Sequence, residues 1–214
     1  MPRSQKDFAI SRISNSIKLA VSFGCLLSSV PIKAETAESS IYTDSQNGFS
    51  MKTFPGWITN FGKVPRTTMA KFAPEETLFV GSNFAEGSSL SVTKSNAPRL
   101  LKDFDIEWWF APLNDFKDLG SAQLIADLLI LQRQGEFEKK TTTSEIVEAK
   151  IDDGVLYFRF RTPLARQVDR ETIAKAYLKN NSIYTLWISG LTSVFEGEYA
   201  SKLTTIRDSF VITN

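Results

Sequence analysis

Residues 155–162 constrain the fold of this chain more than any other segment. Apolar side chains alternate there with more polar ones, as in a strand with one buried face. The preceding Asp153-Gly154 dipeptide is typical of two-residue hairpin turns, so residues 141–151 are expected to form the partner strand. The phenylalanines then face the core, and the arginines face solvent or a partner. The two predicted faces carry Leu156, Phe158 and Phe160 on one side and Tyr157, Arg159 and Arg161 on the other.

The same kinds of signal predict a second hairpin and several single strands. Residues 173–179 and 183–189 flank Asn180-Asn181, where asparagine tolerates a positive φ. Pro74-Glu75-Glu76 is interpreted as a turn rather than a catalytic acid pair, because acidic residues are common in turns. The other predicted strands cover residues 49–54, 67–72, 78–84 and 88–93.

Two helices are expected among these strands. Ser121 is the predicted N-cap of the first helix and Gly135 its stop, and residues 195–207 form the second. A short extended segment at 209–212 closes the chain. Antiparallel hairpins with separate helices indicate the α+β class, an antiparallel β-sheet flanked by helices. The predicted buried helix residues are Leu124, Ile125, Leu128, Leu129 and Leu131, followed by Tyr199, Leu203 and Ile206.

Composition excludes several functional classes. The 214 residues include no histidine and one cysteine, which excludes Ser-His-Asp and Cys-His catalysis and the usual zinc ligand sets. A formal net charge of +1 gives no electrostatic case for nucleic acid. The sequence has no G-x-G-x-x-G motif, P-loop, G-x-S-x-G motif or EF-hand spacing. We therefore expect no enzymatic activity and no cofactor beyond weak calcium association.

The N-terminal segment differs from the rest of the chain. Residues 1–34 carry most of the basic excess, and residues 19–32 are apolar but too short to span a membrane. This pattern is typical of a cleavable signal, with cleavage expected after Ala34; the alternative is an amphipathic helix of the mature fold. Residues 35–46 are then a flexible lead-in, and residues 47–214 form the mildly acidic domain.

Cys25 offers a second interpretation of this segment. A lipoprotein signal places an acylated cysteine just after the apolar region, which would anchor the protein to a membrane. Ser22 stands where an aliphatic residue is preferred, and Leu26 and Leu27 continue the apolar run. Lipidation at Cys25 is therefore the less favoured alternative.

Two groups of residues are candidate docking sites. Trp108-Trp109-Phe110 either packs on the sheet or forms an exposed patch, since aromatic residues are enriched at binding hot spots. Arg159 and Arg161, with Arg166 and Arg170, either form a basic face for an acidic partner or are the solvated side of a strand. The nearby acids Asp169 and Glu171 weaken the basic-face interpretation.

The order of several short motifs resembles the PsbP family, the lumenal extrinsic proteins of photosystem II and their relatives. Asn47-Gly48-Phe49 followed by Phe54-Pro55-Gly56-Trp57 is similar to the opening of these proteins. The resemblance spans roughly residues 47–212, and its other motifs lie at residues 88–92, 153–158, 174–177, 180–186 and 206–211.

This resemblance implies an α/β/α sandwich and a non-enzymatic protein of the thylakoid lumen, in a chloroplast or a cyanobacterium. It implies peripheral association with lumenal subunits of photosystem II or another thylakoid membrane complex. It also implies support of the oxygen-evolving complex through calcium and chloride retention. Because the chain has no histidine and a short lead-in, an accessory or assembly factor is the alternative. An exported small-ligand-binding protein or a carboxylate-dependent hydrolase is the alternative of another class.

Overall fold

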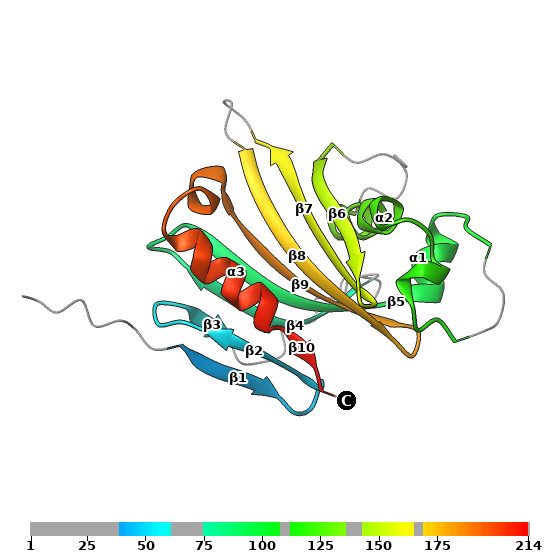
Figure 1. Cartoon of the computed structure of the whole chain (residues 1–214), viewed down its shortest axis with the longest axis horizontal. Coiled ribbons are helices and arrows are strands. Elements are labelled where there is room, and N and C mark those ends of the chain that lie inside the picture. The colour runs from blue at the N-terminus through cyan, green and yellow to red at the C-terminus, as the bar shows by residue number, and fades with distance from the viewer. Residues whose placement is uncertain (1–38, 61–74, 108–111, 136–142, 165–168, 214) are drawn as a thin grey trace, which may run out of the picture. The chain divides into compact units, whose positions relative to one another are not determined.

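A large antiparallel sheet forms the centre of the fold in this computed structural model, which describes residues 39–60, 75–107, 112–135, 143–164 and 169–213. Its seven strands lie in the order β3-β4-β5-β9-β8-β7-β6 (Figure 1). Their bounds are β3 Ile58–Asn60, β4 Glu75–Asn83, β5 Ser88–Asn96, β6 Glu145–Asp152, β7 Val155–Pro163, β8 Asp169–Lys179 and β9 Ser182–Leu191. A three-stranded sheet has the order β1-β2-β10, with bounds Ser40–Asp44, Phe49–Thr53 and Val211–Ile212.

Turn chemistry fixes the two predicted hairpins. Asp153 and Gly154 have φ values of 47° and 72°, as a two-residue turn that matches the strand twist requires. Asn180 and Asn181 have φ values of 49° and 61°. The turns join β6 to β7 and β8 to β9, so both hairpin predictions are confirmed.

The helix α2 (Ala122–Gln134) begins and ends where its capping residues predict. The Ser121 side chain accepts a hydrogen bond from the Leu124 backbone at 3.2 Å, and Gly135 ends the helix with a φ of 68°. Four of the five predicted core residues of this helix are buried. Leu124 is 42% exposed, because it lies beside the apolar stripe rather than within it, so its predicted burial is wrong.

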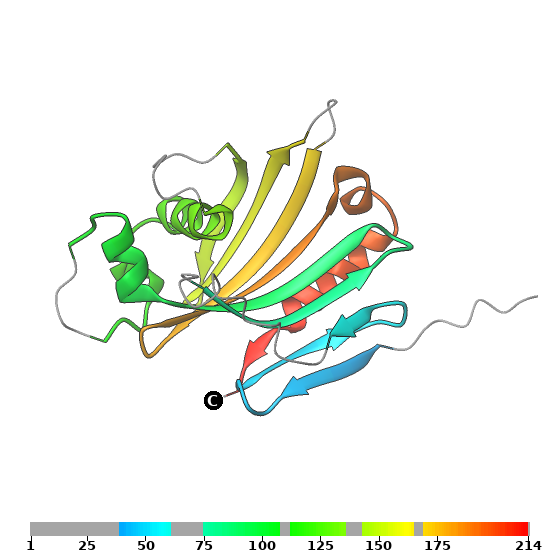
Figure 2. The same cartoon turned by 180° about the vertical axis from the view of Figure 1, so that it is seen from behind.

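Each face of the large sheet is covered by a different layer. Helix α1 (Ala97–Asp103), the short 3-10 helix η2 (Phe116–Asp118) and α2 share one hydrophobic cluster with the sheet, around Trp187. Helix α3 (Tyr199–Ser209) and the three-stranded sheet share the other, around Phe49 and Phe210 (Figures 1 and 2). The expected α/β/α arrangement is therefore present, with a small sheet added to the α3 layer.

Several sequence expectations need correction. The lead-in assigned to residues 35–46 contains β1, because residues 40–44 pair with β2 over five positions. The predicted turn at Glu75-Glu76 is the start of β4, paired with Lys94 and Ser95 of β5. The predicted helix at 195–207 begins at Tyr199, after the 3-10 helix η3 (Thr192–Phe195). The strand expected at 67–72 lies outside the described residues.

Candidate docking groove

A groove of about 430 Å³ lies between α3 and the side of β6 and β7 that faces it. We call it the α3 groove. Helix α3 packs over β8, β9 and β2, so the edge strands beyond β8 form an uncovered wall within the described residues. The residues that line the groove are Glu148, Lys150, Asp152, Tyr157, Phe158, Arg159, Ile173, Phe195, Ala200, Thr204, Arg207 and Asp208.

A β-bulge arranges the charges along this wall. Ile146 is paired with Phe160 and Glu148 with Arg159, so β6 carries one extra residue, Val147. Glu145 is opposite Arg161, and both acids therefore lie across from the two arginines of β7. Without the bulge, strict alternation would place one of these acids on the other face of the sheet.

Arg159 and Arg161 share one buried carboxylate. Arg161 Nε donates a hydrogen bond to Glu171 Oε2 at 3.2 Å, and Arg159 Nη2 forms an ion pair with Glu171 Oε1. The Glu171 side chain is fully buried, whereas the arginine side chains are 35% and 39% exposed. Two guanidinium groups therefore share one carboxylate, and the three side chains together carry a net positive charge.

Glu171 is paired with both arginines inside the sheet. An isolated carboxylate in a protein interior is strongly disfavoured, and its burial is tolerated when it is paired and hydrogen-bonded. Among the described residues, the buried Nε atom of Arg159 and the buried Oε1 atom of Glu171 have no hydrogen-bond partner, so the ion pair with Arg159 Nη2 is the contact that Oε1 makes. In the Arg159–Glu171–Arg161 cluster, the buried Glu171 carboxylate contacts both arginines on their inner side, and the arginine side chains remain partly exposed.

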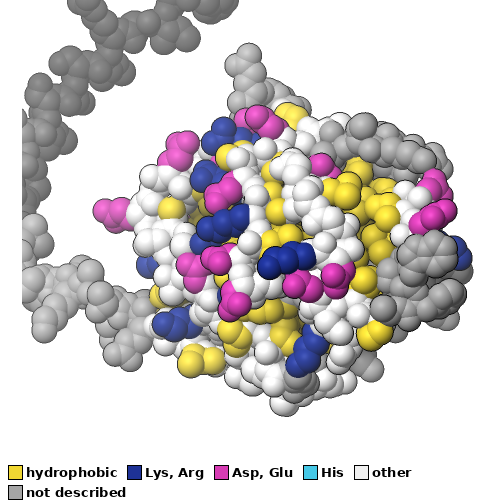
Figure 3. Space-filling view, turned by 45° about the vertical axis from the view of Figure 1, so that its right-hand side comes forward, with side chains coloured by type: hydrophobic (Ala, Val, Ile, Leu, Met, Phe, Trp, Pro, Cys, Tyr) yellow, Lys and Arg dark blue, Asp and Glu magenta, His cyan; other side chains and the backbone are white. Residues whose placement is uncertain are grey.

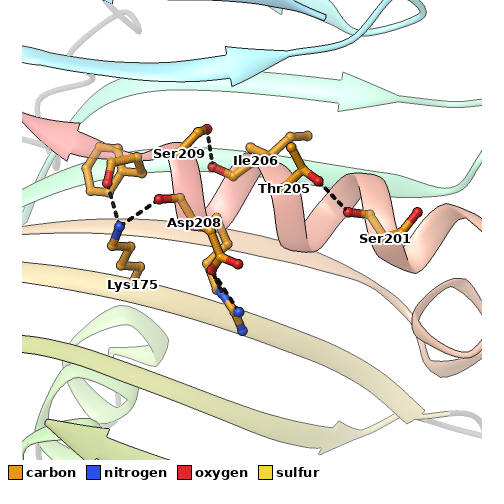
Figure 4. A network of polar contacts seen from close by, with 8 residues as sticks. Lys175, Ser201, Thr205, Ile206, Asp208 and Ser209 are labelled. Atoms are coloured by element: carbon orange, nitrogen blue, oxygen red, sulfur yellow. Dashed lines mark hydrogen bonds and ion pairs between the residues drawn. The ribbon is translucent and has the colours of Figure 1, made fainter. Parts of the chain in front are cut away.

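Lys175 forms the second charged contact, at the C-terminal end of α3. Its Nζ atom donates hydrogen bonds to the backbone oxygens of Asp208 at 2.9 Å and Phe210 at 2.8 Å (Figure 4). A cation is favourable there, because the last carbonyl groups of a helix carry partial negative charge. Burial lowers the pKa of Lys175 below its ordinary value, although the Asp208 carboxylate acts in the opposite direction.

Three cations surround the ring of Tyr157. The Nζ atoms of Lys150 and Lys175 lie 5.8 Å and 5.6 Å from its centroid, and the guanidinium carbon of Arg207 lies 5.7 Å from it. Burial raises the pKa of Tyr157, and the Asp208 carboxylate adds to this shift. Arg207 is also paired with Asp208, with 2.8 Å between Nη2 and Oδ1.

The structure brings together two of the four arginines that the sequence singled out. Arg159 and Arg161 lie on the α3 side of β7, but Arg170 is paired with Thr162 and Leu191 and lies on the opposite face of β8 from Glu171. Arg166, Trp108, Trp109 and Cys25 lie outside the described residues. Sequence analysis missed the roles of Glu171 and Lys175. These residues are four positions apart on β8 and therefore lie on the same face of the strand. Together with the pairing of β8 and β7, this spacing is the signal that could have identified them.

The described residues contain no group of three or more histidine, cysteine, aspartate or glutamate side chains that could hold a metal ion. None of the helices in the described part of the chain is long and apolar enough to cross a membrane. Basic and acidic side chains are interspersed on the face shown in Figure 3 rather than gathered by sign. Charged side chains and aromatic rings line the α3 groove.

Comparison with solved structures identifies a similar fold. The solution structure of cyanobacterial PsbP (CyanoP) from Synechocystis sp. PCC 6803 matches with a TM-score of 0.56 and 19% sequence identity. The match covers 84% of this chain and 95% of that one. No family model and no curated protein matches the sequence. The likeness confirms the fold implied by the sequence motifs, an α+β fold of the PsbP type.

Proposed function

We propose that this protein is a non-enzymatic, PsbP-like protein of the thylakoid lumen that docks on photosystem II or another thylakoid membrane complex. The observation that carries the proposal is the likeness of its fold to cyanobacterial PsbP over 84% of the chain. The resemblance of the Asn47-Gly48-Phe49 and Phe54-Pro55-Gly56-Trp57 motifs to the same family supports it independently. The signal-like segment at residues 1–34 agrees with passage into the lumen.

The α3 groove supports docking as the mode of action. Partly exposed arginines with a shared buried counter-ion suit a reversible interface, because exposed charges attract a partner strongly at low salt and weakly at high salt. The Arg159–Glu171–Arg161 cluster is fixed within the sheet, so little side-chain ordering is needed when a partner binds.

The finer part of the proposal is support of the oxygen-evolving complex through calcium and chloride retention. It predicts that removing the protein lowers oxygen evolution and that added calcium chloride restores it. The alternative is an accessory or assembly factor, which the lack of histidine favours because family metal ligands have no counterpart here. In that case, removal should reduce the amount of assembled complex, and added ions should not restore it.

The test is co-purification with thylakoid complexes followed by a salt wash. We expect the protein to be retained with a membrane complex at low salt. It should be released near 1 M salt, where the Debye length is ~3 Å, and rebind after dialysis. Failure to associate at low salt would contradict the docking proposal and favour a free ligand-binding protein or a hydrolase. Retention at high salt would favour lipidation at Cys25 or an apolar interface such as Trp108-Trp109.

A further inference from the structure

We propose that the turn between β4 and β5 binds an arginine-bearing segment of the partner protein, with Phe84 and Glu86 as the main contacts. This inference rests on the proposed docking function and names the chemistry of the partner at a second surface. That surface includes a recess of about 660 Å³ beside the turn, which we call the turn recess. It shares no lining residue with the α3 groove.

Phe84 is the most exposed large apolar side chain in the described part of the chain, at 78%. Hydrogen bonds nevertheless hold the backbone around it. Gly87 N donates to the Phe84 oxygen at 3.4 Å, and Glu86 N donates to Asn83 Oδ1 at 3.2 Å. Asn83 is 5% exposed and donates to Tyr199 OH at 3.0 Å. An aromatic side chain on a turn fixed in this way can contact a partner with little ordering of the backbone.

The turn lies at one end of the large sheet, beside η3 and the start of α3 (Figure 1). Gly190 at the end of β9 lies between the turn and η3. A Cβ atom there would be 3.5 Å from the Gly87 oxygen and 3.5 Å from Val194 Cβ. Side chains from the turn, η3 and α3 line the turn recess, among them Glu86, Val194, Tyr199 and Lys202, together with Glu198.

Unpaired acidic side chains surround the turn recess. Glu86 and Glu198 line it, and Glu196 directly follows η3. All three are exposed, and no ion pair involves their carboxylates within the described residues. Lys202 is the one basic residue among those that line the recess, and its Nζ atom lies 5.6 Å from the centroid of the Tyr199 ring. The carboxylates outnumber the ammonium group, so the charge of this surface favours a basic ligand.

The combination of rings and carboxylates favours arginine over lysine. The position of Lys202 shows that the Tyr199 ring accepts a cation on its face. A guanidinium group stacks on aromatic rings and also donates paired hydrogen bonds to a carboxylate. An arginine of the partner can therefore stack on Phe84 and pair with Glu86, which belongs to the same turn. The ammonium group of lysine is more strongly hydrated and lacks the paired donors.

The same charges favour a protein segment over a lipid surface. Segments that lie on membranes carry lysine and arginine beside their apolar side chains, because these cations are attracted to anionic lipids. Phe84 has glutamates beside it instead, and an anionic bilayer repels them. A protein segment that carries arginine matches the exposed ring and the carboxylates together.

Variants of Phe84 separate the aromatic ring from its apolar surface. Phe84→Leu keeps an apolar side chain but removes the ring, and Phe84→Trp restores a ring. Because Phe84 is exposed, neither change disturbs the core. Ile41→Ala is the control, since Ile41 is 72% exposed and lies on β1 of the small sheet.

A double variant tests the carboxylates. Glu86→Gln with Glu198→Gln removes the two acidic groups that line the turn recess, and both residues are exposed. Asp118→Asn with Glu145→Gln is the matched control, because it makes the same change in net charge at exposed positions elsewhere.

The experiment measures binding of a fluorescent oligoarginine peptide to the full chain by anisotropy, with folding checked by circular dichroism. We expect tighter binding of oligoarginine than of oligolysine of equal length. Phe84→Leu should raise Kd about threefold, and Phe84→Trp should bind as wild type does. The double glutamate variant should raise Kd about fivefold. Both controls should change it less than about twofold.

Three outcomes would overturn the inference: equal oligoarginine affinity of wild type and Phe84→Leu, equal affinity of the double glutamate variant and its control, or tighter binding of oligolysine. Binding of phosphatidylglycerol vesicles that Phe84→Leu weakens, without oligoarginine binding, would assign the turn to a membrane and also overturn it. The two proposals fail separately. Thylakoid association without oligoarginine binding retains the proposed function and rejects the turn inference. Oligoarginine binding that depends on Phe84, without thylakoid association, does the reverse.

Discussion

Lys175 Nζ lies 2.8 Å from the backbone oxygen of Phe210 and ties the central sheet to the end of α3. The same oxygen accepts a hydrogen bond from Tyr177 OH at 3.0 Å. Phe210 is fully buried and directly precedes β10, which pairs with β2. Two side chains of β8 thus hold the point where the chain leaves the helix and enters the small sheet.

Lys175→Met is expected to destabilise the domain. It removes two hydrogen bonds to carbonyl oxygens. The Phe210 oxygen keeps its hydrogen bond from Tyr177 OH, so the main loss is at the part-buried Asp208 oxygen, where an unsatisfied group costs about 1–3 kcal/mol, and loss of the buried charge offsets part of this. Urea unfolding measures the change in free energy. Lys179→Met, at the exposed end of the same strand, should have a much smaller effect. Equal midpoints for the two variants would show that the contact to Phe210 contributes little.

Tyr177→Phe should lower the free energy of unfolding at neutral pH. It should also make that free energy depend less on pH in the alkaline range. Loss of the hydrogen bond to Phe210 costs about 0.5–1.5 kcal/mol. Burial raises the pKa of Tyr177 from 10.0 to about 12. The native state therefore binds more protons than the unfolded state between these values, and wild-type stability falls as pH rises through them. Chemical unfolding across this range should show a steeper decline for wild type than for Tyr177→Phe.

Glu75→Gln tests a second pKa shift, on the α2 side of the sheet. Glu75 Oε1 lies 3.5 Å from Arg133 Nη1, but burial raises the pKa of Glu75 more than Arg133 lowers it. The stability associated with protonated Glu75 is present below pH 4.5 and is lost as pH rises through the raised pKa. The wild-type minus variant difference in unfolding free energy should therefore decrease over that interval. A difference that increases with pH would mean that attraction to Arg133 dominates.

Phe158→Ala should cost about 3–5 kcal/mol, because the ring is 3% exposed and removing it leaves a cavity. Phe158 packs edge-on against Trp187, with 5.4 Å between the ring centroids. Val147→Ala, at the exposed bulge of β6, is the control and should change stability by less than about 1 kcal/mol. A thermal midpoint unaffected by Phe158→Ala would contradict the assignment of this face to the core.

The mature protein is expected to begin near Glu35, because the basic and apolar segment ends there. N-terminal sequencing of protein isolated from membranes measures this directly. Detection of residues 1–20 on the mature chain would reject both export and the lumenal location.

Local chemistry explains which elements the sequence predicts. The backbone conformations at Asp153-Gly154 and at the Ser121 and Gly135 caps are set by these residues themselves. The hairpin and α2 can therefore be predicted without knowledge of the rest of the fold. The N-cap of α1 is equally local: Asn96 accepts a hydrogen bond from the Arg99 backbone at 2.9 Å, and Pro98 stands in the first turn. This signal was available, and sequence analysis missed it.

The remaining features depend on contacts between distant segments. Strand β1 exists because it pairs with β2, and its Tyr42 ring lies 4.8 Å from that of Phe79. The burial of Glu171 likewise requires the register of β8 against β7, which places it opposite Arg161. Alternation predicted the faces of Arg159 and Arg161, but their shared carboxylate follows only from that register.

The bulge at Val147 also affects how well the edge of the large sheet could accept a strand from another chain. Strand β6 is the last strand of the large sheet within the described residues, and a regular, apolar edge there would invite another chain to add a strand. The extra residue interrupts the hydrogen-bonding ladder near the start of β6, and charged Glu145, Glu148 and Lys150 lie on either side of it. A bulge and charged side chains on an edge strand disfavour the addition of a strand from another chain at β6.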